Sequence, residues 1–105
     1  MLTDVKTWLE TTGMKAAEER FLVPPALPYI VFLEQSNVRG ADTKNCIIER
    51  NISVELYAEK INKEDENKIE ALLNEKSIYY SKDRTWIDSE KFLQTVYDFQ
   101  LVEKL

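Results

Sequence analysis

The most regular pattern in the chain is an alternation of apolar and polar residues between Ile48 and Ala58. Successive side chains of a β-strand point to opposite faces, so this period of two predicts a strand with one face in the core and the other in water. Arg50 interrupts the apolar face. The apolar positions are Ile48, Ile52, Val54, Leu56 and Ala58, and the polar ones are Glu49, Asn51, Ser53, Glu55 and Tyr57.

A second strand is predicted at residues 29–33, where Tyr-Ile-Val-Phe-Leu is β-branched and aromatic on both faces. Such a strand is typical of a sheet centre or of a strand covered on two sides. Pro24, Pro25 and Pro28 precede it and predict a rigid, extended connector. Residues 14–20 fit a helix by their Ala-Ala-Glu-Glu run, or an extended arm after Gly13, and we favour a strand.

Two helices are predicted where apolar residues recur at helical spacing. The first covers residues 4–12, with Thr3 as N-cap and Gly13 at its end. The second covers residues 63–76, with Asn62 and Asp65 as a variant capping box. The apolar positions are Leu2, Val5, Trp8 and Leu9 in the first helix and Ile69, Leu72 and Leu73 in the second.

The C-terminal third of the chain predicts a hairpin. A strand begins at residues 78–80, a turn follows at either 83–84 or 88–89, and residues 93–101 alternate as a last long strand. If Leu93 through Leu101 face the core, apolar groups remain on the other face, which either is simply exposed or covers a neighbouring subunit. That outer face consists of Phe92, Gln94, Val96, Asp98, Gln100 and Val102.

Residues 36–45 are polar, contain Gly40 and lack periodicity, which predicts an exposed loop of about ten residues. Long loops in small domains are often functional. The order of elements predicts a single α+β domain over residues 1–105, with an antiparallel sheet of about four to five strands and two helices packed on one face.

Composition narrows the function more than the fold. The chain has 105 residues, 19 acidic against 14 basic, and a formal charge of −5. No cluster of Lys and Arg forms a basic stripe, so binding to DNA or RNA is disfavoured. The N-terminus lacks the pattern of a secretory signal, and no apolar run reaches the roughly 20 residues of a spanning helix. We therefore expect an intracellular protein that does not bind membranes.

The sequence lacks the residue patterns of the common catalytic, phosphate-binding and zinc sites. Histidine is absent, which removes the commonest general base and most zinc sites, and no glycine-rich loop can cradle a phosphate. Cys46, without histidine to activate it, is interpreted as a small buried apolar residue. The glutamates at 49, 55 and 59 share one strand face and are better explained as a hydrated surface than as an acid–base pair. We expect no enzyme, no cofactor and no metal.

Four segments together resemble a family of small proteins from phages and prophages of Gram-positive bacteria, and the likeness covers nearly the whole chain. The segments are Thr7-Trp8-Leu9-Glu10, Pro25-Ala26-Leu27-Pro28-Tyr29-Ile30-Val31-Phe32, Val54-Glu55-Leu56-Tyr57 and Thr95-Val96-Tyr97-Asp98-Phe99. The family comprises head–tail joining, tail-completion and tail-terminator proteins. The resemblance implies an α+β subunit that forms a homo-oligomer, typically a six-membered ring, between the head connector and the tail tube. It implies no cofactor, and a location in the host cytoplasm during assembly and then in the virion.

This resemblance suggests two sets of assembly contacts, one on the predicted 36–45 loop and one on the outer face of the last strand. A ring uses heterologous contacts, so two different surfaces of each subunit must complement each other. An alternative from another class is an acidic inhibitor or immunity-type protein that binds a basic partner one to one. The candidate contact residues are Arg39, Asp42, Lys44, Phe92, Val96 and Val102.

Overall fold

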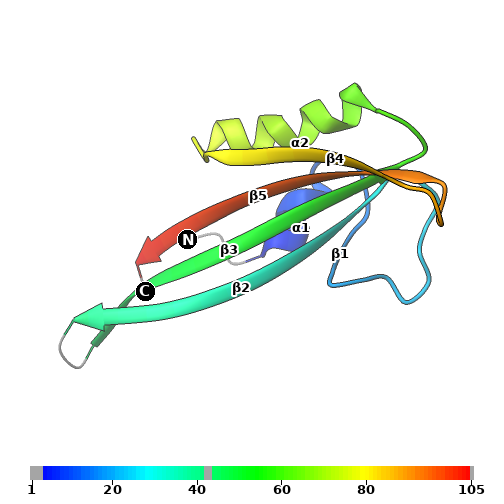
Figure 1. Cartoon of the computed structure of the whole chain (residues 1–105). Coiled ribbons are helices and arrows are strands. Elements are labelled where there is room, and N and C mark those ends of the chain that lie inside the picture. The colour runs from blue at the N-terminus through cyan, green and yellow to red at the C-terminus, as the bar shows by residue number, and fades with distance from the viewer. Residues whose placement is uncertain (1–3, 42–43, 105) are drawn as a thin grey trace.

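The structure, a computed structural model, describes residues 4–41 and 44–104, with the backbone alone at 41 and 44–46. Two helices and five strands follow one another along the chain, and Figure 1 shows them as one curved sheet with helices against it. The elements are α1 (Val5–Glu10), β1 (Ala16–Glu18), β2 (Tyr29–Ala41), β3 (Lys44–Ala58), α2 (Lys63–Glu75), β4 (Tyr80–Ile87) and β5 (Phe92–Lys104).

The five strands form one sheet in the order β1-β2-β3-β5-β4. Neighbouring strands are antiparallel except β1, which pairs with β2 in parallel over three residues. The α+β fold is therefore as predicted, but the sheet is mixed rather than purely antiparallel. The cause is the proline-containing segment 19–28, which returns the chain to the end of the sheet where β1 began, so that β2 runs in the same direction as β1.

Both helices pack on the same face of the sheet, as the sequence predicts. A single core cluster joins them to that face, and the rings of Trp8 and Phe99 meet edge to face with centroids 6.3 Å apart. Burial of this much apolar surface is the main source of stability. The buried members of the cluster are Val5, Leu9, Met14, Ala16, Ile30, Phe32, Ile52, Val54, Leu56, Ile69, Leu73, Tyr97 and Phe99.

Helix α1 is shorter than predicted and is capped by a different residue. Asp4 is the N-cap, because its carboxylate accepts a hydrogen bond from the backbone N–H of Thr7 at 3.0 Å. An N-cap side chain satisfies one of the free N–H groups of the first turn, and Asp does this as well as Thr. The helix ends at Glu10, and the N–H of Gly13 donates to the carbonyl of Glu10.

Gly13 has φ +93°, so we expect Gly13→Ala to lower the free energy of unfolding by about 1 kcal/mol. The penalty comes from the backbone and not from crowding, since an added Cβ would meet no heavy atom within 4 Å. Chemical denaturation of both proteins measures it. Gly13→Asn is the matched control, because asparagine tolerates positive φ and should cost less. Equal losses for the two variants would contradict a backbone origin.

The predicted loop at residues 36–45 is wrong: residues 36–41 belong to β2 and residues 44–45 to β3. The two strands pair antiparallel from Tyr29 opposite Tyr57 to Ala41 opposite Lys44, with a register shift between Arg39 and Gly40. Residues 36–40 are exposed on both faces of the sheet, so this part of β2 needs no apolar alternation and resembles a loop in sequence. Backbone pairing with the partner strand decides the outcome.

The other predicted strands and the second helix are present, although β4 begins at Tyr80 and not at residue 78. In the segment 14–20, where helix and strand were both possible, residues 16–18 form strand β1. Asn62 caps α2, and the C-terminal turn falls at residues 88–91, the second of the two predicted places. In β5 the side chains of Thr95, Tyr97 and Phe99 are buried on the helix side, as the alternation requires.

Candidate assembly surface

The candidate site is the face of the sheet opposite the helices, which we call the open face. In the described part of the chain no helix covers it. The register places Phe92, Val96 and Val102 of β5 on it, as the sequence predicts. Phe92 and Val96 are half-buried, whereas the side chain of Val102 is 56% exposed, so the apolar surface increases away from the turn at residues 88–91.

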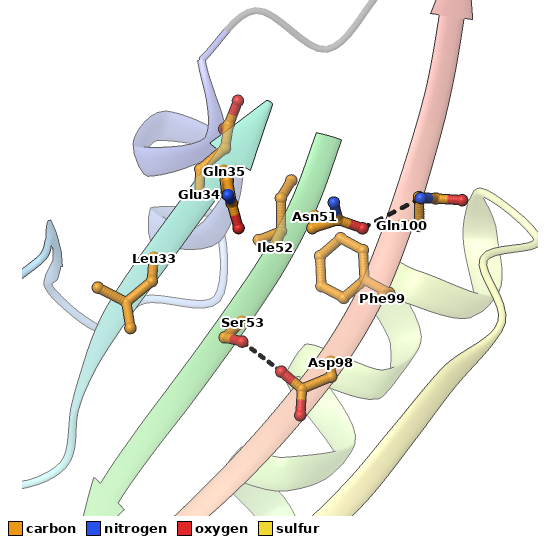
Figure 2. A pocket seen from close by; sticks show the side chains of 9 residues that line it. All are labelled: Leu33, Glu34, Gln35, Asn51, Ile52, Ser53, Asp98, Phe99 and Gln100. Atoms are coloured by element: carbon orange, nitrogen blue, oxygen red, sulfur yellow. Dashed lines mark hydrogen bonds between the residues drawn. The ribbon is translucent and has the colours of Figure 1, made fainter. Parts of the chain in front are cut away.

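A hollow of about 510 Å³ lies on this face across β2, β3 and β5 (Figure 2). The side chain of Leu33 stands at one side of the hollow and is 43% exposed. Across it, the hydroxyl of Ser53 donates to Asp98, and the amide of Gln100 donates to Asn51 at 3.1 Å. The hollow thus has an apolar side and a polar side, both accessible from solvent.

One end of the open face is closed by a row of four aromatic rings. Tyr57 lies between Tyr29 and Phe92, with ring centroids 5.3 and 4.8 Å away, and Phe21 of the 19–28 segment packs edge to face on Tyr29. Burial, together with the hydrogen bond to the Glu55 carboxylate, raises the pKa of Tyr57 to about 12. These rings are packed against one another, so the accessible part of the face begins beyond them.

Of the three candidates placed on the predicted loop, the structure locates one side chain. Arg39 lies on the open face of β2, 66% exposed, with its Nε atom 2.5 Å from a carboxylate oxygen of Glu49 on β3. Asp42 lies outside the described residues, as do the side chains of Lys44 and Cys46. Arg39 and the β5 candidates therefore share one face but are carried by strands, not by a loop.

The helix side of the sheet contains a buried ionic cluster that the sequence reasoning missed. Glu66 of α2 is only 1% exposed and accepts two hydrogen bonds from the Arg84 guanidinium, at 2.6 and 2.8 Å. Lys82 and the Thr95 hydroxyl also contact its carboxylate. The pairing with Arg84 lowers the pKa of Glu66 to about 2. One signal was present in the sequence: Glu66 lies three and seven residues before Ile69 and Leu73, on the apolar stripe.

A second buried ion group ties the three long strands together. Arg50, the residue that interrupts the apolar face of β3, is 5% exposed and donates to Glu34 of β2 at 2.8 Å and to Glu103 of β5 at 2.9 Å. Its guanidinium lowers the pKa of Glu34. Among the described residues no buried side-chain nitrogen or oxygen lacks a hydrogen-bond partner, so both ion groups are satisfied internally.

The geometry brings no catalytic pair together from the glutamates of β3. Glu49 contacts Arg39, Glu55 accepts from the Tyr57 hydroxyl, and Glu59 follows the end of the strand. Glu49 and Glu55 are six residues apart along one strand, which is about 20 Å. Among the side chains that the structure describes, no group of three or more acidic residues is arranged to hold a metal ion.

None of the helices in the described ranges has both the length and the apolar character needed to span a membrane.

Comparison with models of known protein families finds no match, and comparison with curated proteins finds no similar sequence.

Proposed function

We propose that the chain is a structural subunit of the head–tail junction of a phage or prophage, of the tail-terminator or tail-completion type. It acts by assembling with copies of itself, in a ring, between the head connector and the tail-tube protein. The proposed location in the virion rests on the resemblance of the four sequence segments to the family of head–tail joining, tail-completion and tail-terminator proteins. The mode of action is supported by the structure of the surface.

The observation that carries the proposal is the open face with the long strands that extend it. Strands β2, β3 and β5 run side by side past the end of α2 (Figure 1), so much of the sheet has no helix on it. Leu33 and Val102 are exposed by 43% and 56% on the open face, and Val38 is exposed by 49% on the opposite face of β2. Apolar side chains on an uncovered strand pair are a typical interaction surface. A subunit that presents such a surface can join two neighbours at once.

A second candidate function is a one-to-one inhibitor of a basic protein. The observation that favours it is the acidic middle of the open face, where Glu55 and Asp98 lie on neighbouring strands and Arg39 is already paired with Glu49. Complementary charge of this kind speeds association with a basic partner. The two candidates differ in stoichiometry, since an inhibitor forms a heterodimer and a junction subunit forms a closed oligomer.

The test is negative-stain electron microscopy with light scattering on the protein alone at high concentration, and mixed with the tail-tube protein of the same phage. We expect discrete rings, capping the end of the tube in the mixture. A protein that stays monomeric in every condition, or that forms a tight heterodimer with a basic enzyme, would overturn the proposal.

A further inference from the structure

Both outer edges of the sheet carry backbone groups that are free to pair. On one side β4 is the last strand. On the other side β1 covers β2 only where residues 16–18 lie opposite residues 30–32. Within the described residues, no strand lies along β2 beyond Leu33. Free strand edges are templates for pairing with another chain.

Hydrogen bonds at β1 identify which groups of β2 point outward. The N–H of Ile30 donates to Lys15, and the N–H of Glu19 donates to the carbonyl of Phe32. Even-numbered residues of β2 therefore point their N–H and C=O groups at this edge, and the alternation continues to Glu34, Ser36 and Val38 before the register shift. The pairing registers of β3, β5 and β4 extend the same alternation to β4, where the backbone N–H and C=O groups of four residues point at the opposite edge of the sheet. These are Tyr80, Lys82, Arg84 and Trp86.

We propose that β4 of one copy pairs antiparallel with residues 33–39 of β2 in the next copy, so that the sheet continues from subunit to subunit. This inference rests on the proposed ring. Strand β4 runs opposite to β2 within the sheet. The two edges therefore meet in the antiparallel sense. Within one subunit Asp83 is level with Val31, so placing Asp83 opposite Asn37 of the next copy displaces neighbouring copies by six residues, about 20 Å, along the strands. Over four strand spacings, about 19 Å, this displacement corresponds to strands tilted by about 45° to the ring axis, as in a β-barrel. The contact is heterologous, and heterologous contacts form a ring when the rotation between successive copies closes.

Lengths and side chains suit this pairing. Strand β4 has eight residues, enough to cover the free stretch of β2. With Leu33 opposite Ile87, two apolar side chains meet on the open face, and Asn37 lies opposite Asp83. Arg39 is then diagonal to the Asp83 carboxylate, within the reach of cross-strand pairs.

The charged side chains of β4 do not block its edge. Lys and Arg on edge strands often prevent pairing. Here Lys82 reaches Glu66 and Glu70, at 3.1 and 2.7 Å, and Arg84 reaches Glu66, so both side chains turn toward α2 on the helix side. The backbone groups of the strand stay accessible.

The decisive experiment uses cysteine pairs in a Cys46→Ser background. Asn37→Cys and Asp83→Cys face each other in the proposed pairing without sharing ladder hydrogen bonds, a geometry with Cα atoms about 4.5 Å apart that suits a disulfide. Within one subunit Asp83 is level with Val31, three strand spacings away, and Asn37 lies six residues farther along β2, so the two residues are about 24 Å apart and any bond between them joins two copies. Oxidation should give a covalent ladder up to the ring size on a non-reducing gel.

The matched control is Asn37→Cys with Gln100→Cys, which lies on the same face but on an interior strand and should give no ladder. Ser36→Pro removes an outward N–H and no β2–β3 hydrogen bond, so it should stay folded by circular dichroism and lose rings, whereas Ser36→Ala keeps them.

Rings that persist in Ser36→Pro, with no ladder from the 37/83 pair, would overturn edge pairing and leave the proposed function standing. Dimers from Asp83→Cys alone, without higher species, would also overturn it, because they indicate a symmetric β4–β4 contact. Absence of any oligomer, with or without tail-tube protein, would overturn both proposals together.

Discussion

Replacing Glu66 with alanine is expected to lower the free energy of unfolding by about 3 kcal/mol, measured by chemical denaturation at pH 7. The carboxylate is 1% exposed and holds Arg84, Lys82 and the Thr95 hydroxyl. Without it, the buried Thr95 hydroxyl loses its acceptor, Arg84 loses its carboxylate partner, and Lys82 keeps only its pairing with Glu70. The connection between α2 and strands β4 and β5 is weakened as a result.

Glu75→Ala is the matched control, since Glu75 lies exposed at the other end of the same helix and should change stability by less than about 0.5 kcal/mol. Similar losses in the two variants would mean that helix propensity, and not the buried pairing, is responsible.

Acid should produce the same loss in the unmodified protein. The pKa of Glu66 is about 2 in the folded chain, below its ordinary value of 4.5. Because the folded-state pKa is depressed, the stabilisation is complete above pH 4.5 and disappears as the pH falls from 4.5 toward 2, a change of about 3 kcal/mol. Glu66→Gln has no such proton to bind, so the difference between the two proteins should shrink over this range. A difference that stays constant with pH would exclude Glu66 as the origin.

The sequence predicts the helix-covered half of the molecule well because apolar periodicity records burial. The alternation in β3 and β5 and the stripe of α2 each reflect one face against the core. Residues 36–40 lie beyond that core and are exposed on both faces of the sheet, so they show no apolar periodicity. Backbone pairing between the two strands of the hairpin supplies the order there, and no apolar pattern in the sequence marks that pairing.

The candidate surface was predictable only in part. The alternation of β5 correctly placed Phe92, Val96 and Val102 together on the open face. The free edge of β2 follows from β1 being three residues long, which depends on where the chain turns after Glu18 and not on any motif. Both buried ion groups join residues from different strands or from a strand and a helix, so their partners could not be read from spacing along the chain.

The extension owes part of its order to Arg50, and Arg50→Met is expected to lower the free energy of unfolding by about 3 kcal/mol. The guanidinium holds Glu34 and Glu103 from the strands on either side, and these two carboxyl side chains are only 19% and 14% exposed. With the cation gone, two partly buried negative charges face each other. The pKa of Glu34, now held low by Arg50, should rise.

Hydrogen exchange locates the effect of this substitution. We expect faster exchange in the outer parts of β2, β3 and β5. The amides of α2 and of the strands beneath it should lose protection only by as much as the overall decrease in the free energy of unfolding accounts for. The triple variant Arg50→Met, Glu34→Leu, Glu103→Leu should regain most of the stability, because apolar side chains of similar size replace a buried ion group at little cost. Uniformly faster exchange, or no recovery in the triple variant, would contradict a local role for Arg50. If the ring forms through the β2 edge, Arg50→Met should also weaken assembly under conditions where the protein remains folded, since that edge lies on the part of the sheet that Arg50 holds in register.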